Sequence, residues 1–143
     1  MVFSLFASEN KKLVKKWKKE HQELLEISSK VIEKYEKNDL KATKKLVVEL
    51  EKKVLKHIMI EDIELHNIEI CEKRGTDQVK KSIHKFHKTF HEFKMILMDF
   101  LTKYSKKEEE LDEEFIESFK ALAQILIQRI EDEENGLFAL LEK

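Results

Sequence analysis

Hydrophobic residues recur every three or four positions along most of the chain, and short polar stretches interrupt the pattern at three places. This period matches the buried face of an α-helix. It predicts four helices, over residues 8–36, 40–73, 78–104 and 112–142. Because the interruptions are only a few residues long, successive helices are expected to lie side by side and antiparallel. The sequence therefore predicts an all-α fold, an up-down-up-down antiparallel four-helix bundle that forms one domain over residues 1–143.

Short polar residues mark the ends of the predicted helices. Asp39 and Asp112 each precede a periodic stretch, where a carboxylate can accept a hydrogen bond from the first helical N–H groups. Gly75 can end the second helix, and either Thr76 or Asp77 can begin the third. The chain has no Pro and only two Gly, and this scarcity of helix-breaking residues favours long helices.

The charge balance and the single cysteine limit the classes of partner and compartment. The chain has 28 Lys and Arg against 29 Asp and Glu, so neither nucleic acid nor an anionic membrane is expected to bind. A free thiol at Cys71 fits a reducing, cytoplasmic location. Residues 1–7 are apolar but too few for a signal peptide or a membrane span. They could pack against the bundle end or against a partner, either another protein or a second copy in a homodimer.

Every predicted helix carries His or Glu residues on its apolar face. The histidines are His21, His57, His84, His87 and His91, and the carboxylates are Glu61, Glu133 and Glu134. His57 and Glu61 are four residues apart, as are His87 and His91, so each pair lies on one side of its helix. Alone, such a residue is more often a core histidine or a solvated carboxylate. Burying all of them without partners would be costly, however, so the joint pattern favours a metal site, and imidazole with carboxylate suits iron.

Four short motifs built on these residues resemble those of the hemerythrin-like (HHE cation-binding) family. They are Trp17-Lys-Lys-Glu-His21-Gln-Glu-Leu-Leu, His57-Ile-Met-Ile-Glu61-Asp, His87-Lys-Thr-Phe-His91-Glu-Phe and Arg129-Ile-Glu-Asp-Glu133-Glu134. The resemblance covers essentially the whole chain and rests on the order and spacing of the motifs. It implies a di-iron centre in which the terminal ligands are His21, His57, His87 and His91, the bridging carboxylate is Glu61, and the second carboxylate is Glu133 or Glu134.

Arg129 departs from the resemblance, because the family has a histidine at this place on its fourth helix. A guanidinium stays protonated and has no lone pair for a metal. His84 could supply the missing nitrogen, or one iron could keep an open coordination position, or only one metal could bind. Alternatively, Arg129 could pair with Glu133 in a decayed site, or extend outward from the edge of the apolar face. We favour a surviving site with altered metal occupancy.

Lys94 is a second unexpected residue on an apolar stripe. It follows His87 by seven residues on the same inward line, ~10 Å further along the helix. Three interpretations stay open. The ammonium could reach solvent, line a ligand pocket or neutralise a carboxylate.

The resemblance implies reversible binding of dioxygen at a non-haem di-iron centre, for carriage, storage or sensing. Relatives bind nitric oxide or handle iron, so a nitric-oxide or iron-handling protein is one alternative. A metal-free regulatory or interaction bundle with a decayed site is the other. The sequence shows nothing typical of a nucleophile-base pair or a phosphate-binding loop, so we expect a binding protein and not an enzyme.

Overall fold

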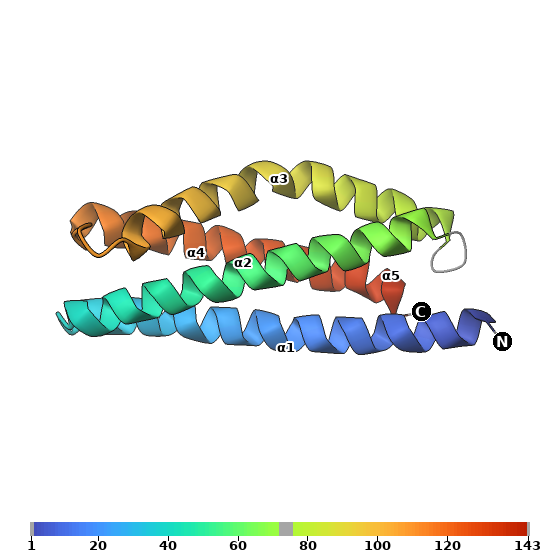
Figure 1. Ribbon diagram of the computed structural model, residues 1–143, viewed down its shortest axis with the longest axis horizontal. Helices are drawn as coiled ribbons and strands as arrows, with labels where there is room; N and C mark the ends of the chain where they lie inside the picture. The colour runs from blue at the N-terminus through green and yellow to red at the C-terminus, as the bar shows by residue number, and fades with distance from the viewer. Residues whose placement is uncertain (1, 72–75, 143) are drawn as a thin grey trace.

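The computed structural model describes residues 2–71 and 76–142, with side chains from residue 8 onward. Its elements are α1 (Val2–Glu36), α2 (Leu40–Ile70), α3 (Asp77–Ser105), α4 (Glu113–Glu133), the π-helical turn η1 (Glu134–Phe138) and α5 (Ala139–Leu141). The last three follow one another without a break and form the fourth long helix (Figure 1). The described residues contain no strand. The predicted all-α four-helix bundle is confirmed.

The helices begin where polar side chains can cap them. Asp39 accepts a hydrogen bond from the Ala42 amide at 3.1 Å, and Asp112 accepts one from Phe115 at 2.9 Å. At the start of α3 the cap is Thr76, one of the two predicted alternatives. These bonds satisfy amide groups that have no partner within the helix.

Two helix boundaries differ from the predicted ones by more than one residue, and some predictions fall outside the described residues. The helix α1 begins at Val2, six residues before the predicted start, and α2 ends at Ile70 and not at residue 73. The predicted packing of the residue 1–7 side chains and the predicted helix end at Gly75 lie outside the described residues.

The buried apolar residues form two clusters along the bundle axis. One cluster includes Leu24, Val54 and Phe93, towards the end where α1 turns into α2. The other includes Trp17 and Leu65, towards the opposite end. On α1, α2 and the fourth helix, the stretch between these clusters carries buried His and Glu residues. The apolar core is therefore interrupted by one polar layer near the middle of the bundle.

The turn η1 changes which residues of the fourth helix face inward. The helical pattern predicts Leu137 and Leu140 as core residues. The structure buries Leu137, Phe138 and Leu141 and leaves Leu140 only half-buried. A π-turn accommodates one extra residue and so shifts the phase of the residues that follow it. As a result Phe138, five residues after Glu133, faces the same interior and stacks on the His21 ring, with centroids 5.5 Å apart.

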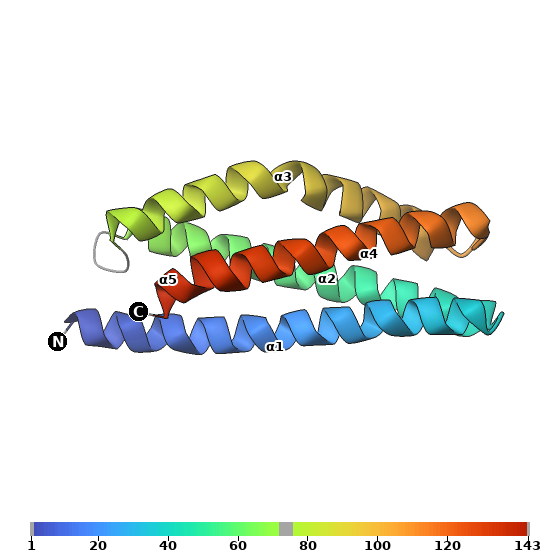
Figure 2. The same cartoon turned by 180° about the vertical axis from the view of Figure 1, so that it is seen from behind.

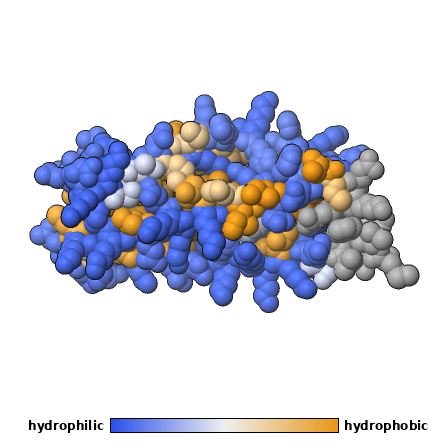
Figure 3. All heavy atoms as spheres, in the orientation of Figure 1, coloured by the Kyte–Doolittle hydropathy of each residue, from blue (hydrophilic) through white to orange (hydrophobic). Residues whose placement is uncertain are grey.

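In Figure 1 the helix α2 lies nearest the viewer, with α3 above it and α1 below. Seen from behind in Figure 2, α4 lies nearest the viewer between α3 and α1. The face in Figure 3 is mostly hydrophilic, with a broken band of hydrophobic residues along its middle. Exposed apolar side chains on α2 include Leu55, Met59 and Ile63. In the described part of the chain, no helix has the length and apolar character needed to cross a membrane.

Candidate metal centre

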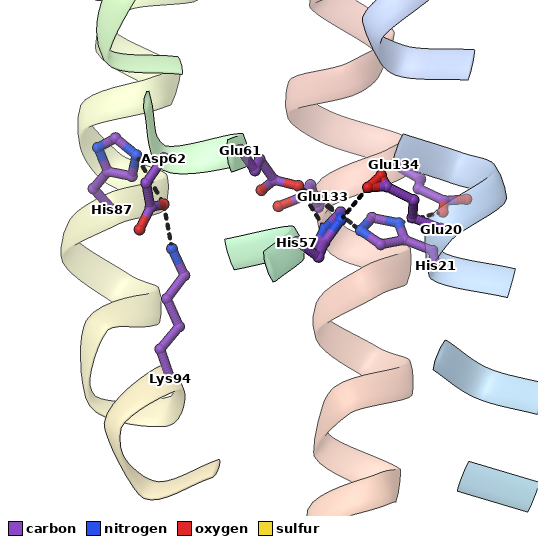
Figure 4. A network of polar contacts seen from close by, with 9 residues as sticks. All are labelled: Glu20, His21, His57, Glu61, Asp62, His87, Lys94, Glu133 and Glu134. Carbon is purple, nitrogen blue, oxygen red and sulfur yellow. Dashed lines mark hydrogen bonds and ion pairs between the residues drawn. The ribbon is translucent and has the colours of Figure 1, made fainter. Parts of the chain in front are cut away.

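Three helices bring four donor side chains together in the polar layer. His21 comes from α1, His57 and Glu61 from α2, and Glu133 from the end of α4. All four are buried, between 3% and 8% exposed, and one donor atom from each lies within 4.8 Å of the others. Figure 4 shows the carboxylates of Glu61 and Glu133 directed towards the two imidazoles. Two nitrogen and two oxygen donors at this spacing suit a single metal ion.

The contacts within this four-donor cluster are close. His57 Nε2 lies 2.8 Å from Glu61 Oε2, and His21 Nε2 lies 3.1 Å from Glu133 Oε1. Both oxygens are fully buried, yet neither has a hydrogen bond of good geometry. Buried polar atoms are normally hydrogen-bonded, and an exception calls for an explanation such as a bound ion. The residues present therefore fit a metal cation.

Two further carboxylates hold the imidazoles from behind. His21 Nδ1 lies 2.7 Å from Glu134 Oε2, and His57 Nδ1 lies 3.4 Å from Glu20 Oε1. An imidazole that donates its Nδ1–H to a carboxylate presents a lone pair at Nε2. In both residues that Nε2 faces the cluster. Histidine ligands of metal sites are commonly oriented by such carboxylates.

The surroundings of the two carboxyl groups give them opposite protonation preferences. Burial, reinforced by the negative charge of Glu61, raises the pKa of Glu133 well above its ordinary value. Burial also acts to raise the pKa of Glu61, but the contacts with His57 and a hydrogen bond with Glu133 outweigh it and lower that pKa. Without a metal, Glu133 therefore holds its proton more tightly than Glu61 does.

The two imidazoles differ in the same way. Burial lowers the pKa of His21, although the hydrogen bond with Glu134 opposes that effect. Burial also acts to lower the pKa of His57, but the contacts with Glu61 and Glu20 outweigh it and raise that pKa. Both shifts favour a positive His57 beside a negative Glu61 in the metal-free protein. A cation entering the cluster would replace this positive charge and the Glu133 proton.

A cavity of about 50 Å³ adjoins the four-donor cluster. Its walls are mostly apolar and include Phe86, Phe90, Phe93, Leu97, Leu126 and Ile130. Two cationic residues, Lys94 and Arg129, also line it. Lys94 pairs with Asp62 at 2.7 Å, so this lysine both lines the pocket and neutralises a carboxylate, two of the predicted possibilities.

Arg129 is half-buried and faces an aromatic ring. Its guanidinium carbon lies 4.7 Å from the centre of the Phe90 ring, a cation–π contact. Between these described residues there is no ion pair joining Arg129 to Glu133, and Glu133 instead contacts His21. A decayed site was expected to show a salt bridge between Arg129 and Glu133. The arginine does not form this salt bridge.

The histidines of α3 lie outside the four-donor cluster. The side chain of His84 is 76% exposed, with its Nδ1 4.0 Å from Glu69. His91 is exposed, and His87 lies beside Asp62, with 3.7 Å between His87 Nε2 and Asp62 Oδ1. The reason is the helical phase of α3, which turns its Phe stripe towards the interior. Metal binding by His84, His87 and His91 stays a prediction.

Between the two predicted alternatives on the fourth helix, the structure places Glu133 in the cluster and Glu134 behind His21. Sequence reasoning did not identify Glu20, Asp62 or Phe138 as parts of the site. Glu20 precedes His21 and Asp62 follows Glu61 in the chain, and this proximity to predicted ligands could have identified them. Phe138 reaches His21 through the π-turn, for which the periodicity gave no signal.

A family model agrees with this arrangement over almost the whole chain. The model described as "Hemerythrin HHE cation binding domain" matches residues 12–141. This range contains all four donors and both carboxylates behind the imidazoles. No curated protein and no solved structure matches the chain.

Proposed function

The chain belongs to the hemerythrin HHE cation-binding family, and from this premise we propose that it is a non-haem iron protein that binds a small diatomic ligand. Iron would be held by His21, His57, Glu61 and Glu133. Dioxygen or nitric oxide would enter the adjoining apolar cavity. The observation that carries the proposal is the buried four-donor cluster, whose unpaired carboxylate oxygens face imidazole nitrogens.

The donor set favours iron over the other common metals. Two neutral imidazoles and two carboxylates form a mixed nitrogen and oxygen set, and sites of this kind with open positions bind ferrous iron. Calcium and magnesium prefer oxygen ligands, and structural zinc sites are commonly rich in cysteine. The one cysteine, Cys71, lies at the end of α2, away from the cluster residues in the chain. A ferrous ion bound here would supply an electron donor and an open coordination position.

The cavity suits a small neutral ligand. One water molecule needs about 10–15 Å³ of accessible cavity volume, so a cavity of about 50 Å³ has room for a small molecule. Apolar walls do not replace the hydrogen bonds of a charged or strongly polar ligand. Dioxygen and nitric oxide need few hydrogen bonds and fit this volume. The Phe stripe of α3 would also exclude bulk water from the cluster.

The protein residues have distinct tasks in this proposal. Glu20 and Glu134 orient the imidazoles so that each Nε2 faces the ion. Glu133 gives up its proton as the cation enters, and Phe138 covers the outer face of His21. These tasks amount to binding and orientation, so we propose carriage, storage or sensing of the ligand, and no catalytic turnover.

The experiment is anaerobic purification with ferrous iron, followed by a metal count and absorption spectra before and after addition of dioxygen or nitric oxide. We expect bound iron, and a spectral change that reverses when the gas is removed. The zinc-loaded protein is the control, since zinc has no redox chemistry and should give no spectral response. Absence of stoichiometric metal would overturn the proposal. Bound iron with no spectral response to either gas would overturn the proposed binding of a diatomic ligand and leave iron binding intact.

A further inference from the structure

A second polar group lies beside the four-donor cluster, between α2 and α3 (Figure 4). It consists of Asp62, His87 and Lys94. Asp62 Oδ1 lies 2.7 Å from Lys94 Nζ and 3.7 Å from His87 Nε2. That nitrogen of His87 is buried and makes no hydrogen bond. We call these three residues the seam cluster.

Without Lys94, the seam cluster would offer donors for a cation. An imidazole nitrogen and a carboxylate oxygen 3.7 Å apart can both reach one ion at ordinary bond lengths of about 2.0–2.2 Å. Lys94 lines the same cavity as the four donors, so an ion in its place would lie next to the four-donor cluster. A two-metal centre in this bundle would therefore have its second ion at the seam cluster.

Lys94 takes up this place with a fixed positive charge. Its side chain is only 16% exposed, and its ammonium lies 5.4 Å from the centre of the Phe86 ring. An ammonium has three donors and no lone pair, so it cannot bind a metal while charged. It also repels a divalent cation at a separation of a few ångströms.

We propose that the Lys94 ammonium stands in the place of a second metal ion, so that the chain binds one metal ion per bundle. The charges support this stoichiometry, because one divalent ion balances Glu61 and Glu133 while Lys94 balances Asp62. The positions of His84 and His91 support it too, since both are exposed and neither contributes to the seam cluster. This inference rests on the proposed function, because it presupposes that the four-donor cluster binds metal.

The test counts metal ions per chain by native mass spectrometry and calorimetry, with ferrous iron under anaerobic conditions and with cobalt(II) as a second probe. The wild-type chain should bind one ion. Lys94→Met removes the charge while keeping a long apolar side chain, and it should bind two. Lys94→Arg keeps the charge and should bind one. The matched control is Lys88→Met, an exposed lysine on the same helix, which should bind one.

A further pair of variants identifies the donors of the second ion. In the Lys94→Met background, His87→Ala should return the count from two to one. In the wild-type background, Asp62→Asn should leave the count at one, because Asp62 does not bind the first ion. Circular dichroism confirms that each variant is folded. If Lys94→Met does not fold, the wild-type and Asp62→Asn counts still test the predicted stoichiometry of one metal ion per chain.

The outcomes separate this inference from the proposed function. Two ions in the wild-type chain, or loss of the single ion in Asp62→Asn, would overturn the inference while leaving metal binding intact. A count of one in a folded Lys94→Met variant would overturn the role of Lys94. No metal in any variant would overturn the proposed function itself. One ion in the wild type and two in Lys94→Met would support both.

Discussion

Two groups of His and carboxylate side chains lie next to each other in this bundle, and they differ in burial and in their nearest cation. The four-donor cluster is buried, and its imidazoles are held from behind by Glu20 and Glu134. The seam cluster is partly exposed, with Asp62 at 42% and His87 at 30% side-chain exposure. It has no carboxylate behind its imidazole in any contact between described residues, and Lys94 provides its cation.

The comparison shows that residue type alone does not make a metal site. Glu61 and Asp62 are consecutive, yet a helix turns by about 100° per residue, so their carboxylates point to different neighbours. Glu61 meets His57 and Glu133 in the interior, and Asp62 meets α3. What separates the clusters is burial, the orientation of the imidazoles and the presence of a fixed ammonium. Each of these can be changed by substitution.

The largest expected effect comes from Glu133→Gln. Burial raises the pKa of Glu133 and so favours its protonated carboxyl, whose shape the amide nearly matches, so stability without metal should change by no more than about 1 kcal/mol. The amide cannot supply the negative charge that a cation needs, however. Metal affinity should therefore fall by more than about 100-fold. Removing a residue that only hydrogen-bonds to a metal ligand typically lowers the affinity by about 10–100-fold.

Calorimetric titration with metal and urea unfolding of the metal-free protein measure these two quantities. The control is Glu131→Gln, an exposed glutamate on α4 two residues earlier, which should change neither. Unchanged metal affinity in Glu133→Gln would contradict the assignment of Glu133 as a ligand. A large loss of stability without metal would contradict its protonated state.

A smaller effect is expected from the carboxylates behind the imidazoles. Glu134→Gln weakens the 2.7 Å contact that orients His21, and it should lower metal affinity by about 10–100-fold. Glu20→Gln acts on the longer 3.4 Å contact with His57 and should have less effect. Calorimetric titration of both variants checks the order. Equal affinities of both variants and the wild type would show that these carboxylates do not orient the ligands.

The pH dependence of metal binding should follow from the raised pKa of Glu133. Below that pKa the carboxyl carries a proton that the cation has to displace, so affinity falls as the pH is lowered. One displaced proton corresponds to about a tenfold change in affinity per pH unit. His57, whose pKa is also raised, acts in the same direction. Titrations over a pH series measure how steeply metal affinity changes with pH. This dependence should be weaker in Glu133→Gln. A metal affinity that does not change with pH in the wild type would contradict the displacement of a proton.

Most of the fold could be predicted from the sequence, because its determinants are local. The period of apolar residues predicts the four helices, and Asp39 and Asp112 mark two of their starts. The π-turn could not be predicted in this way. It changes the phase of the fourth helix by one residue within Glu134–Phe138. The burial of Phe138 depends on tertiary contacts with His21 and Trp17.

For the candidate site, the sequence identified all four clustered donors as candidates but could not select them from the larger set. The choice depends on the rotation of each helix about its axis, which packing determines. On α3 the Phe stripe and the His edge lie close together, and the structure turns Phe86, Phe90 and Phe93 inward. Burying three phenylalanines is worth more than burying imidazoles that have lost contact with water. The pairing of Lys94 with Asp62 likewise joins residues 32 positions apart.

The smallest expected effect is the sharpest test of the comparison between the two clusters. His57→Ala removes a donor of the four-donor cluster and serves as the reference, because it should weaken metal binding about as much as Glu133→Gln does. His87→Ala removes an imidazole of the same type from the seam cluster, and it should change metal affinity by less than about twofold, since changes at residues that do not contact a site alter energies by no more than about 0.5 kcal/mol. Both are measured by calorimetric titration of folded protein. A loss of affinity in His87→Ala comparable to that in His57→Ala would mean that α3 rotates its histidines inward when metal binds. The two clusters would then be parts of one centre, and the division drawn between them would be wrong.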